Sequence, residues 1–142
     1  MNEYVIDQIQ IGMEHSFKKV ITTEMEDNFR EISGDENPLH WDDRFAIGIG
    51  NGRFKGHVSF GMLTASLYST MAGVFLPGKY SLIHSFDELS FLSPVYAGDE
   101  LEVTGKIVDV KAELNLIMLK VVIRNQDKKV VSRAKMKVLV MK

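Results

Sequence analysis

Residues 61–75 constrain the fold most, because they are apolar on nearly every side of the helix that they would form. The apolar positions follow no single face: Met62, Leu63, Ala65, Leu67, Met71, Ala72 and Val74. A helix that is apolar all round has to be buried, since no face suits water. The glycines and the proline of residues 73–78 would end it. The sequence therefore predicts a central helix, Gly61–Phe75, that other elements must enclose.

The second half of the chain has the alternating, β-branched pattern of strands. The expected strands are residues 89–91, 100–111, 114–125 and 129–141, with a weaker one at 9–20. Asn125–Lys128 is typical of a hairpin turn. Several long antiparallel strands and one buried helix indicate an α+β fold, in which the sheet wraps around the helix. At 142 residues we expect a single domain covering residues 1–142.

Composition excludes several classes of function. The chain has no cysteine, so it has no disulfide, thiolate nucleophile or thiolate metal site, as suits a reducing compartment. A net charge of -2 without a basic run gives no reason to expect nucleic acid. No apolar run approaches the ~20 residues of a membrane span, and the first residues lack a secretory signal pattern. We expect a cytoplasmic protein with a diffusible partner.

Residues 23–40 carry the side chains best suited to chemistry. Thr23–Glu26 has the spacing of a capping box. Met25, Phe29 and Ile32 fall on one face of the helix that would follow. Gly34 is placed to end that helix in the left-handed conformation. The pattern predicts a short helix that leads directly into a stiff turn.

Asp35 and His40 lie on either side of this turn, which Pro38 stiffens by restricting the residue before it. A carboxylate and an imidazole held together can polarise one water and move its protons. Asn37 could orient either group or hold the turn. On spacing alone, the catalytic interpretation is less favoured than a structural turn in which His40 bonds a local carbonyl.

Gly61 would open the central helix. Amides in the first turn of a helix have no partner and carry partial positive charge. Without a side chain, the Gly61 amide could be approached closely by a ligand carbonyl and stabilise negative charge on its oxygen. Taken alone, Gly61 fits tight packing between helix and sheet equally well.

Three segments together resemble the MaoC-like, (R)-specific enoyl-CoA hydratases of the hydratase 2 type. They are residues 29–40, with the string Gly-Asp-Glu-Asn-Pro-Leu-His, residues 61–67, and residues 90–99. The resemblance implies a hot-dog fold and a homodimer or higher oligomer with substrate at the subunit interface. It also implies reversible hydration of a trans-2-enoyl thioester of coenzyme A or acyl-carrier protein to the (R)-3-hydroxyacyl thioester. No cofactor and no metal would be required.

The resemblance also implies roles for individual residues. Asp35 and His40 match the family's catalytic dyad, and the Gly61 amide matches the donor to the thioester oxygen. Asn37 belongs to the same motif and is expected at the substrate. Ser69 matches a helix serine that assists in some members, although a hydroxyl bonded back to the previous turn fits the sequence as well.

Two features depart from the family pattern. Phe60 stands where many members have histidine, and it is a candidate for lining the acyl tunnel. The segment between Phe45 and Gly61 is a few residues longer and richer in glycine than in compact hydratases, and its glycine-rich residues 47–57 are expected as a loop at the substrate entrance. Met62 is a further candidate for contact with the acyl chain, with core packing as the alternative. The other histidines are expected to be structural or on the surface, and His57 is the one nearest the substrate loop: His15, His57 and His84.

Two other functions remain open at this point. A hot-dog thioesterase would direct water at the thioester carbonyl instead of the β-carbon. A non-catalytic domain would bind an acyl thioester without turning it over. A calcium site is not expected, because Pro38 and Leu39 interrupt the ligand pattern that begins at Asp35.

Overall fold

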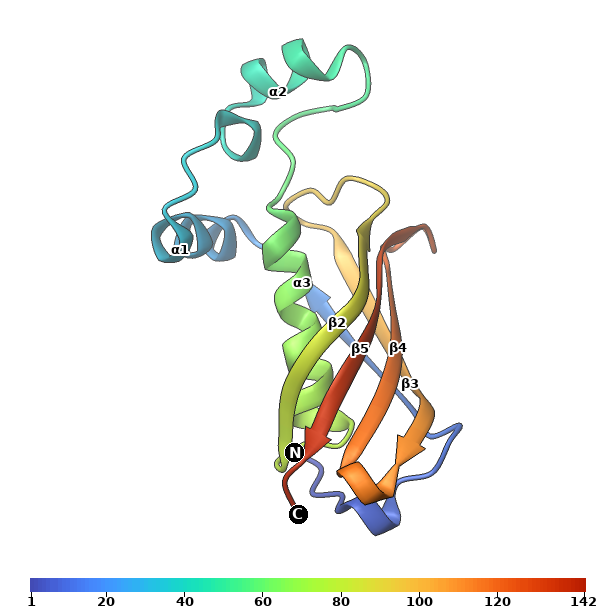
Figure 1. Cartoon of the computed structure of the whole chain (residues 1–142). Coiled ribbons are helices and arrows are strands. Elements are labelled where there is room, and N and C mark those ends of the chain that lie inside the picture. Colours follow the sequence, from blue (N-terminus) through green and yellow to red (C-terminus); the bar gives the residue numbers. More distant parts are fainter.

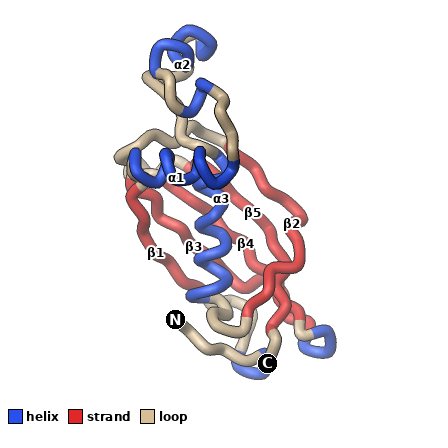
Figure 2. The backbone as a smooth tube through the Cα atoms, turned by 90° about the vertical axis from the view of Figure 1, so that its left-hand side faces the viewer, coloured by secondary structure: helices blue, strands red, loops and turns tan.

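The computed structural model describes residues 1–142 and has one antiparallel sheet with a helix lying along one of its faces (Figures 1 and 2). The strands are β1 (Glu14–Val20), β2 (Ser81–Phe91), β3 (Glu100–Lys111), β4 (Leu116–Arg124) and β5 (Val130–Val140). They lie in the order β1-β3-β4-β5-β2, so β1 and β2 are the edges. The helices are α1 (Thr23–Ser33), α2 (Asp43–Gly50) and α3 (Gly61–Thr70), which continues as the π-helical turn Met71–Phe75. No helix is long and apolar enough to cross a membrane.

The core lies between α3 and the sheet. Alternate residues of β3, β4 and β5 point at the helix and are fully buried, among them Leu101, Ile107, Leu119 and Met136. Gly105 of β3 is needed where Met71 crosses the sheet, since a Cβ at this position would lie 2.7 Å from the Met71 sulfur. The expected sheet wrapped around one helix is therefore confirmed, and helical structure runs from Gly61 to Phe75 as predicted.

The prediction that this helix is enclosed on all sides is wrong in one respect. Met62 is 57% exposed, and Ser66 and Ser69 lie on the same exposed stripe of α3. The positions are spaced four and three residues apart and so share one helical face. This stripe lies open between α1 and β2, whereas the rest of α3 packs on the sheet.

Strand β2 is much longer than the three residues predicted for it. It runs from Ser81 to Phe91 and pairs with β5, with register shifts between Ile83 and Ser85 and between Phe86 and Glu88. Each bulge moves the side-chain alternation to the other face, so the strand has no continuous pattern for the sequence to reveal. The first strand begins later than expected, at Glu14, because Ile11 and Gly12 form a turn in which Gly12 has a φ of 95°.

The N-cap of helix α1 is Thr22, one residue before the predicted Thr23. The hydroxyl of Thr22 accepts the Met25 N–H at 3.2 Å, and the Glu26 carboxylate turns inward instead of closing a capping box. Gly34 ends the helix with φ of 70°, as expected. Ile32 does not share the buried face, because it is 82% exposed, whereas Met25 and Phe29 pack against the core.

The segment predicted as a glycine-rich loop from residue 47 is helical up to Gly50. Asp42 caps α2 by accepting the Phe45 N–H at 3.1 Å, and Asn51 ends it in the left-handed conformation. Gly48 and Gly50 lower helix propensity, but the caps at both ends override it. Figure 1 shows α2 standing away from the sheet, at the far end of the molecule from the two termini.

Candidate active site

The turn after α1 brings Asp35 and His40 together. The Oδ1 atom of Asp35 accepts the backbone N–H of Asn37 at 3.0 Å, and the side-chain oxygen of Asn37 accepts the N–H of Leu39 at 3.0 Å. Two consecutive Asx bonds thus hold the backbone. They leave Asp35 Oδ2 directed at His40 Nε2, 3.9 Å away. Asn37 therefore holds the turn through its side-chain oxygen and orients Asp35 through its backbone N–H.

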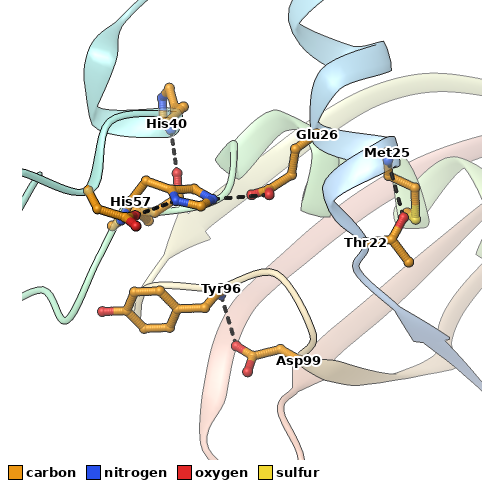
Figure 3. A network of polar contacts seen from close by, with 9 residues as sticks. Thr22, Met25, Glu26, His40, His57, Tyr96 and Asp99 are labelled. Carbon is orange, nitrogen blue, oxygen red and sulfur yellow. Dashed lines mark hydrogen bonds and ion pairs between the residues drawn. The ribbon is translucent and has the colours of Figure 1, made fainter.

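His40 is fixed on its other side. Its Nδ1 lies 2.7 Å from the carbonyl oxygen of Val58 (Figure 3). A carbonyl oxygen only accepts, so Nδ1 carries the hydrogen and Nε2 of the neutral ring is free to take a proton. The ring stacks on Phe60 with centroids 4.2 Å apart. The His40 side chain is 15% exposed and that of Asp35 is 44% exposed, so solvent reaches the pair mainly from the carboxylate side.

The 3.9 Å separation of Asp35 and His40 suits a shared water better than a direct bond. A direct hydrogen bond between these atoms would be about 2.7–3.2 Å long. A single water can bond to both groups at that usual length while they stay 3.9 Å apart. The carboxylate and the free imidazole nitrogen can then take a proton from the same water.

Gly61 forms the first residue of α3, directly after the stacked Phe60. Neither the Gly61 nor the Met62 amide has an acceptor in the protein, and no side chain caps this end. A Cβ on Gly61 would lie 3.2 Å from two ring carbons of Phe91, which leaves little room for a larger residue. The helix start therefore offers free donors close to the Asp35–His40 pair.

Met62 and Ser69 line a groove instead of approaching this pair. The groove has a volume of about 320 Å³ and runs between α1, α3 and β2. Its walls are almost entirely apolar: Phe29, Met62, Ala65, Ser66, Ser69, Ile83, Phe86 and Leu89. The Ser66 hydroxyl donates to the Leu63 carbonyl at 2.6 Å, whereas that of Ser69 has no partner in the protein.

Phe60 lies outside this groove. It is 2% exposed and sits between the His40 ring and Phe29, whose ring centroid is 5.0 Å from its own. The structure thus places Phe60 under the imidazole as a support. Phe29 contacts Phe60 and also lines the groove, so it borders both the ring that supports His40 and the open apolar surface.

A larger cavity of about 410 Å³ lies on the other side of the α3 start. Arg53 and Phe54, from the segment after α2, form part of its wall, and Phe91 forms another part. Phe91 also lies against Gly61, so this cavity is next to the start of α3.

His57 belongs to a polar cluster that the sequence does not reveal. Its Nδ1 lies 2.6 Å from Asp43 Oδ1 and its Nε2 lies 3.2 Å from Glu26 Oε1 (Figure 3). Burial disfavours the His57 cation, but hydrogen bonds to Asp43 and Glu26 outweigh it and raise the pKa of His57. Hydrogen bonds from His57 lower the pKa of Asp43. Glu26, Asp43 and His57 lie far apart in the chain and follow no motif, so no sequence signal joins them. No group of three or more His, Asp or Glu side chains has the arrangement of a metal site.

Comparison with known proteins identifies the family. The model of the MaoC like domain matches residues 7–135. The chain belongs to the MaoC-like family. It is 31% identical over 107 residues to the 3-hydroxybutyryl-CoA dehydratase of Methylorubrum extorquens, covering 75% of this chain and 66% of that one. It is 39% identical over 85 residues to the (R)-specific enoyl-CoA hydratase of Aeromonas caviae, covering 60% of each. The matched part thus spans less than two thirds of these curated relatives.

The fold of this MaoC-like chain also matches a solved structure. The solved structure of the (R)-hydratase from A. caviae involved in PHA biosynthesis superposes with a TM-score of 0.85 at 28% identity. The match covers 94% of this chain and 98% of that one. The hot-dog fold and the family resemblance expected from residues 29–40, 61–67 and 90–99 are therefore confirmed.

Proposed function

We propose that this MaoC-like protein catalyses reversible addition of water to a trans-2-enoyl thioester, giving the (R)-3-hydroxyacyl thioester. The observation that carries the proposal is the geometry of Asp35 and His40. Asp35 Oδ2 and His40 Nε2 have no other partner and lie 3.9 Å apart. The other polar atom of each side chain is held by the backbone, Asp35 Oδ1 by the N–H of Asn37 and His40 Nδ1 by the carbonyl of Val58. The names of the relatives, a dehydratase and a hydratase of acyl-CoA, support the same reaction.

In the proposed hydration, the water bridging Asp35 and His40 adds through its oxygen to the β-carbon. One of its protons passes to the pair as the new C–O bond forms. The π electrons of the double bond move toward the thioester and place negative charge on its carbonyl oxygen. A proton from the pair then reaches the α-carbon. The atoms of one water are added across the double bond, so no oxidant, reductant or cofactor takes part.

The Gly61 amide is the proposed donor to the carbonyl oxygen. It has no acceptor within the protein and stands at the positive end of α3. Negative charge grows on the oxygen only as the transition state forms. A fixed amide aimed at that oxygen therefore stabilises the transition state more than the substrate.

The two hollows beside α3 suggest where the rest of the substrate lies. We place the acyl chain in the apolar groove with Met62 and Ser69, and the pantetheine arm of coenzyme A or of an acyl-carrier protein in the cavity bordered by Arg53. Asn37 contributes to the substrate site through its free side-chain amide. The groove adjoins the edge strand β2, so a second copy docked there would close it. We propose a homodimer as the minimum assembly.

The rival function is a thioesterase, in which the same water attacks the carbonyl carbon. The two reactions give different products from one substrate, so an assay with short and medium enoyl-CoA and enoyl-carrier-protein substrates separates them. Hydration consumes the conjugated enoyl absorbance without releasing thiol. Release of free thiol would identify a thioesterase, and the absence of any turnover would leave a non-catalytic thioester-binding domain.

A further inference from the structure

We propose that His57, held between Glu26 and Asp43, is a positioning residue that fixes the tautomer and orientation of His40. Its effect on rate rests on the hydratase function proposed above, whereas its effect on the His40 ring does not. The cluster of Glu26, Asp43 and His57, called the His57 clamp below, joins α1, the first turn of α2 and the segment before α3 (Figure 3).

The clamp acts through one peptide unit. His57 precedes Val58, whose carbonyl oxygen accepts His40 Nδ1–H at 2.7 Å, and whose N–H donates to the Leu39 carbonyl at 3.0 Å. The Asp43 carboxylate holds the backbone as well as the ring of His57, because its Oδ1 also accepts the His57 N–H at 2.8 Å. The bonds of His57 thus fix the position of the Val58 carbonyl, and that carbonyl in turn fixes the His40 ring through the bond to Nδ1.

Gly56 leaves room for the contact between Asp43 and His57. Gly56 has no side chain where Asp43 approaches, and a Cβ there would lie 3.1 Å from Asp43 Oδ1. Any larger residue at position 56 would displace the carboxylate that holds His57. The glycine of this segment therefore serves close approach, and not only flexibility.

The burial of the Glu26 carboxylate costs free energy, so packing alone does not explain the His57 clamp. Its side chain is 4% exposed, and its Oε2 atom has no hydrogen-bond partner. His57 is its only ion-pair partner, since the nearby Arg30 is paired with Glu36. A buried carboxylate whose sole partner is a partly exposed histidine is unfavourable compared with apolar filling. The arrangement makes sense where the imidazole must be held in one place.

The charge state of His57 decides how firmly the clamp closes. Both carboxylates accept hydrogen bonds, so the ring donates to both only as an imidazolium. A cavity of about 70 Å³ beside it is lined by three further titratable side chains, Asp27, Arg30 and His40. The raised pKa of His57 agrees with a cation held by two carboxylates, after the opposing effect of burial. Loss of its proton would release one bond and leave the Val58 carbonyl less well fixed.

The direct test observes the His40 ring by long-range proton–nitrogen NMR in the intact protein. In the wild type we expect the Nδ1–H tautomer, with Nε2 unprotonated once His40 is neutral. His57→Gln should give a mixture of tautomers at His40. The matched control is His84→Gln, which removes an exposed histidine of β2 that bonds only to Ser85. Unchanged His40 signals in His57→Gln would overturn the proposal.

The kinetic test measures kcat and KM for the same variants. We expect His57→Gln to lower kcat about 10- to 100-fold with little change in KM, as small misplacements of catalytic groups do. Adding Glu26→Gln should recover part of the loss, because the two amides can pair and no buried carboxylate is left without a partner. If kcat falls while the double variant shows no recovery and His40 keeps its tautomer, the positioning role is wrong. If the wild type has no hydratase activity but the tautomer responds, the clamp stands and the proposed function fails.

Discussion

Replacing Gly61 by alanine tests the role of the α3 amide with little disturbance of the fold. The added Cβ would lie 3.2 Å from two ring carbons of Phe91, a few tenths of an ångström closer than ordinary contact. Phe91 is 49% exposed and can move, so the clash is small. Alanine also favours a helix over glycine by about 0.5–1 kcal/mol. The two effects oppose each other, and the unfolding free energy should change by less than about 1 kcal/mol.

The effect of Gly61→Ala on catalysis should be much larger. A methyl group next to the amide narrows the approach of the thioester carbonyl and lengthens its hydrogen bond. Loss of one donor of this kind costs about 10²- to 10³-fold in kcat, or about 2.7–4 kcal/mol. We expect a fall toward that range in a hydration assay, with melting little changed. The control is Gly73→Ala, where the nearest atom to the added Cβ is 3.9 Å away. A Gly61→Ala protein that melts normally and keeps full kcat would refute the assigned role.

Three further predictions concern stability and assembly. Because the pKa of His57 is raised above 6.5, the His57 clamp stabilises the fold fully below pH 6.5 and loses this contribution as pH rises through the raised pKa. The difference in unfolding free energy between wild type and His57→Gln should therefore become smaller as pH rises through that range. A difference that grows instead would contradict a protonated His57. Gly105→Ala should cost about 1–3 kcal/mol by denaturant unfolding, because its Cβ meets Met71 inside the core; an unchanged midpoint would show that Met71 can move aside. Light scattering should show a dimer for the wild type and a monomer for Phe86→Glu, which places a charge in the apolar groove; a monomeric wild type at micromolar concentration would remove the proposed interface.

The sequence predicts those parts of the molecule that follow a regular pattern. The alternation of β3, β4 and β5 and the apolar residues of α3 are visible because each element buries one surface against a single core. The Asp35–His40 turn is visible because its bonds are local, each spanning two residues. Local bonds and regular periods are the features that a sequence carries directly.

The remainder depends on tertiary structure. Strand β2 is hidden by its two bulges, and α2 by glycines whose low helix propensity is overridden at its caps. The buried place of Phe60 follows from the rings on either side of it and not from its neighbours in the chain. His57 looks isolated because its partners are 14 and 31 residues away. Contacts between residues this far apart in the chain leave no periodic pattern in a single sequence.

The claim that Asp35 and His40 act on one shared water is tested most directly by the rates of four proteins. These are the wild type, Asp35→Asn, His40→Ala and the double variant, assayed for loss of the enoyl group. Each single change should lower kcat by at least about 10²-fold. The double variant should be hardly slower than the worse single one, because groups that act as a unit are not additive. Asp127→Asn and His84→Ala, which alter exposed side chains away from the turn, should keep wild-type rates. Full activity in either single variant, or strictly multiplicative losses in the double one, would contradict the shared water.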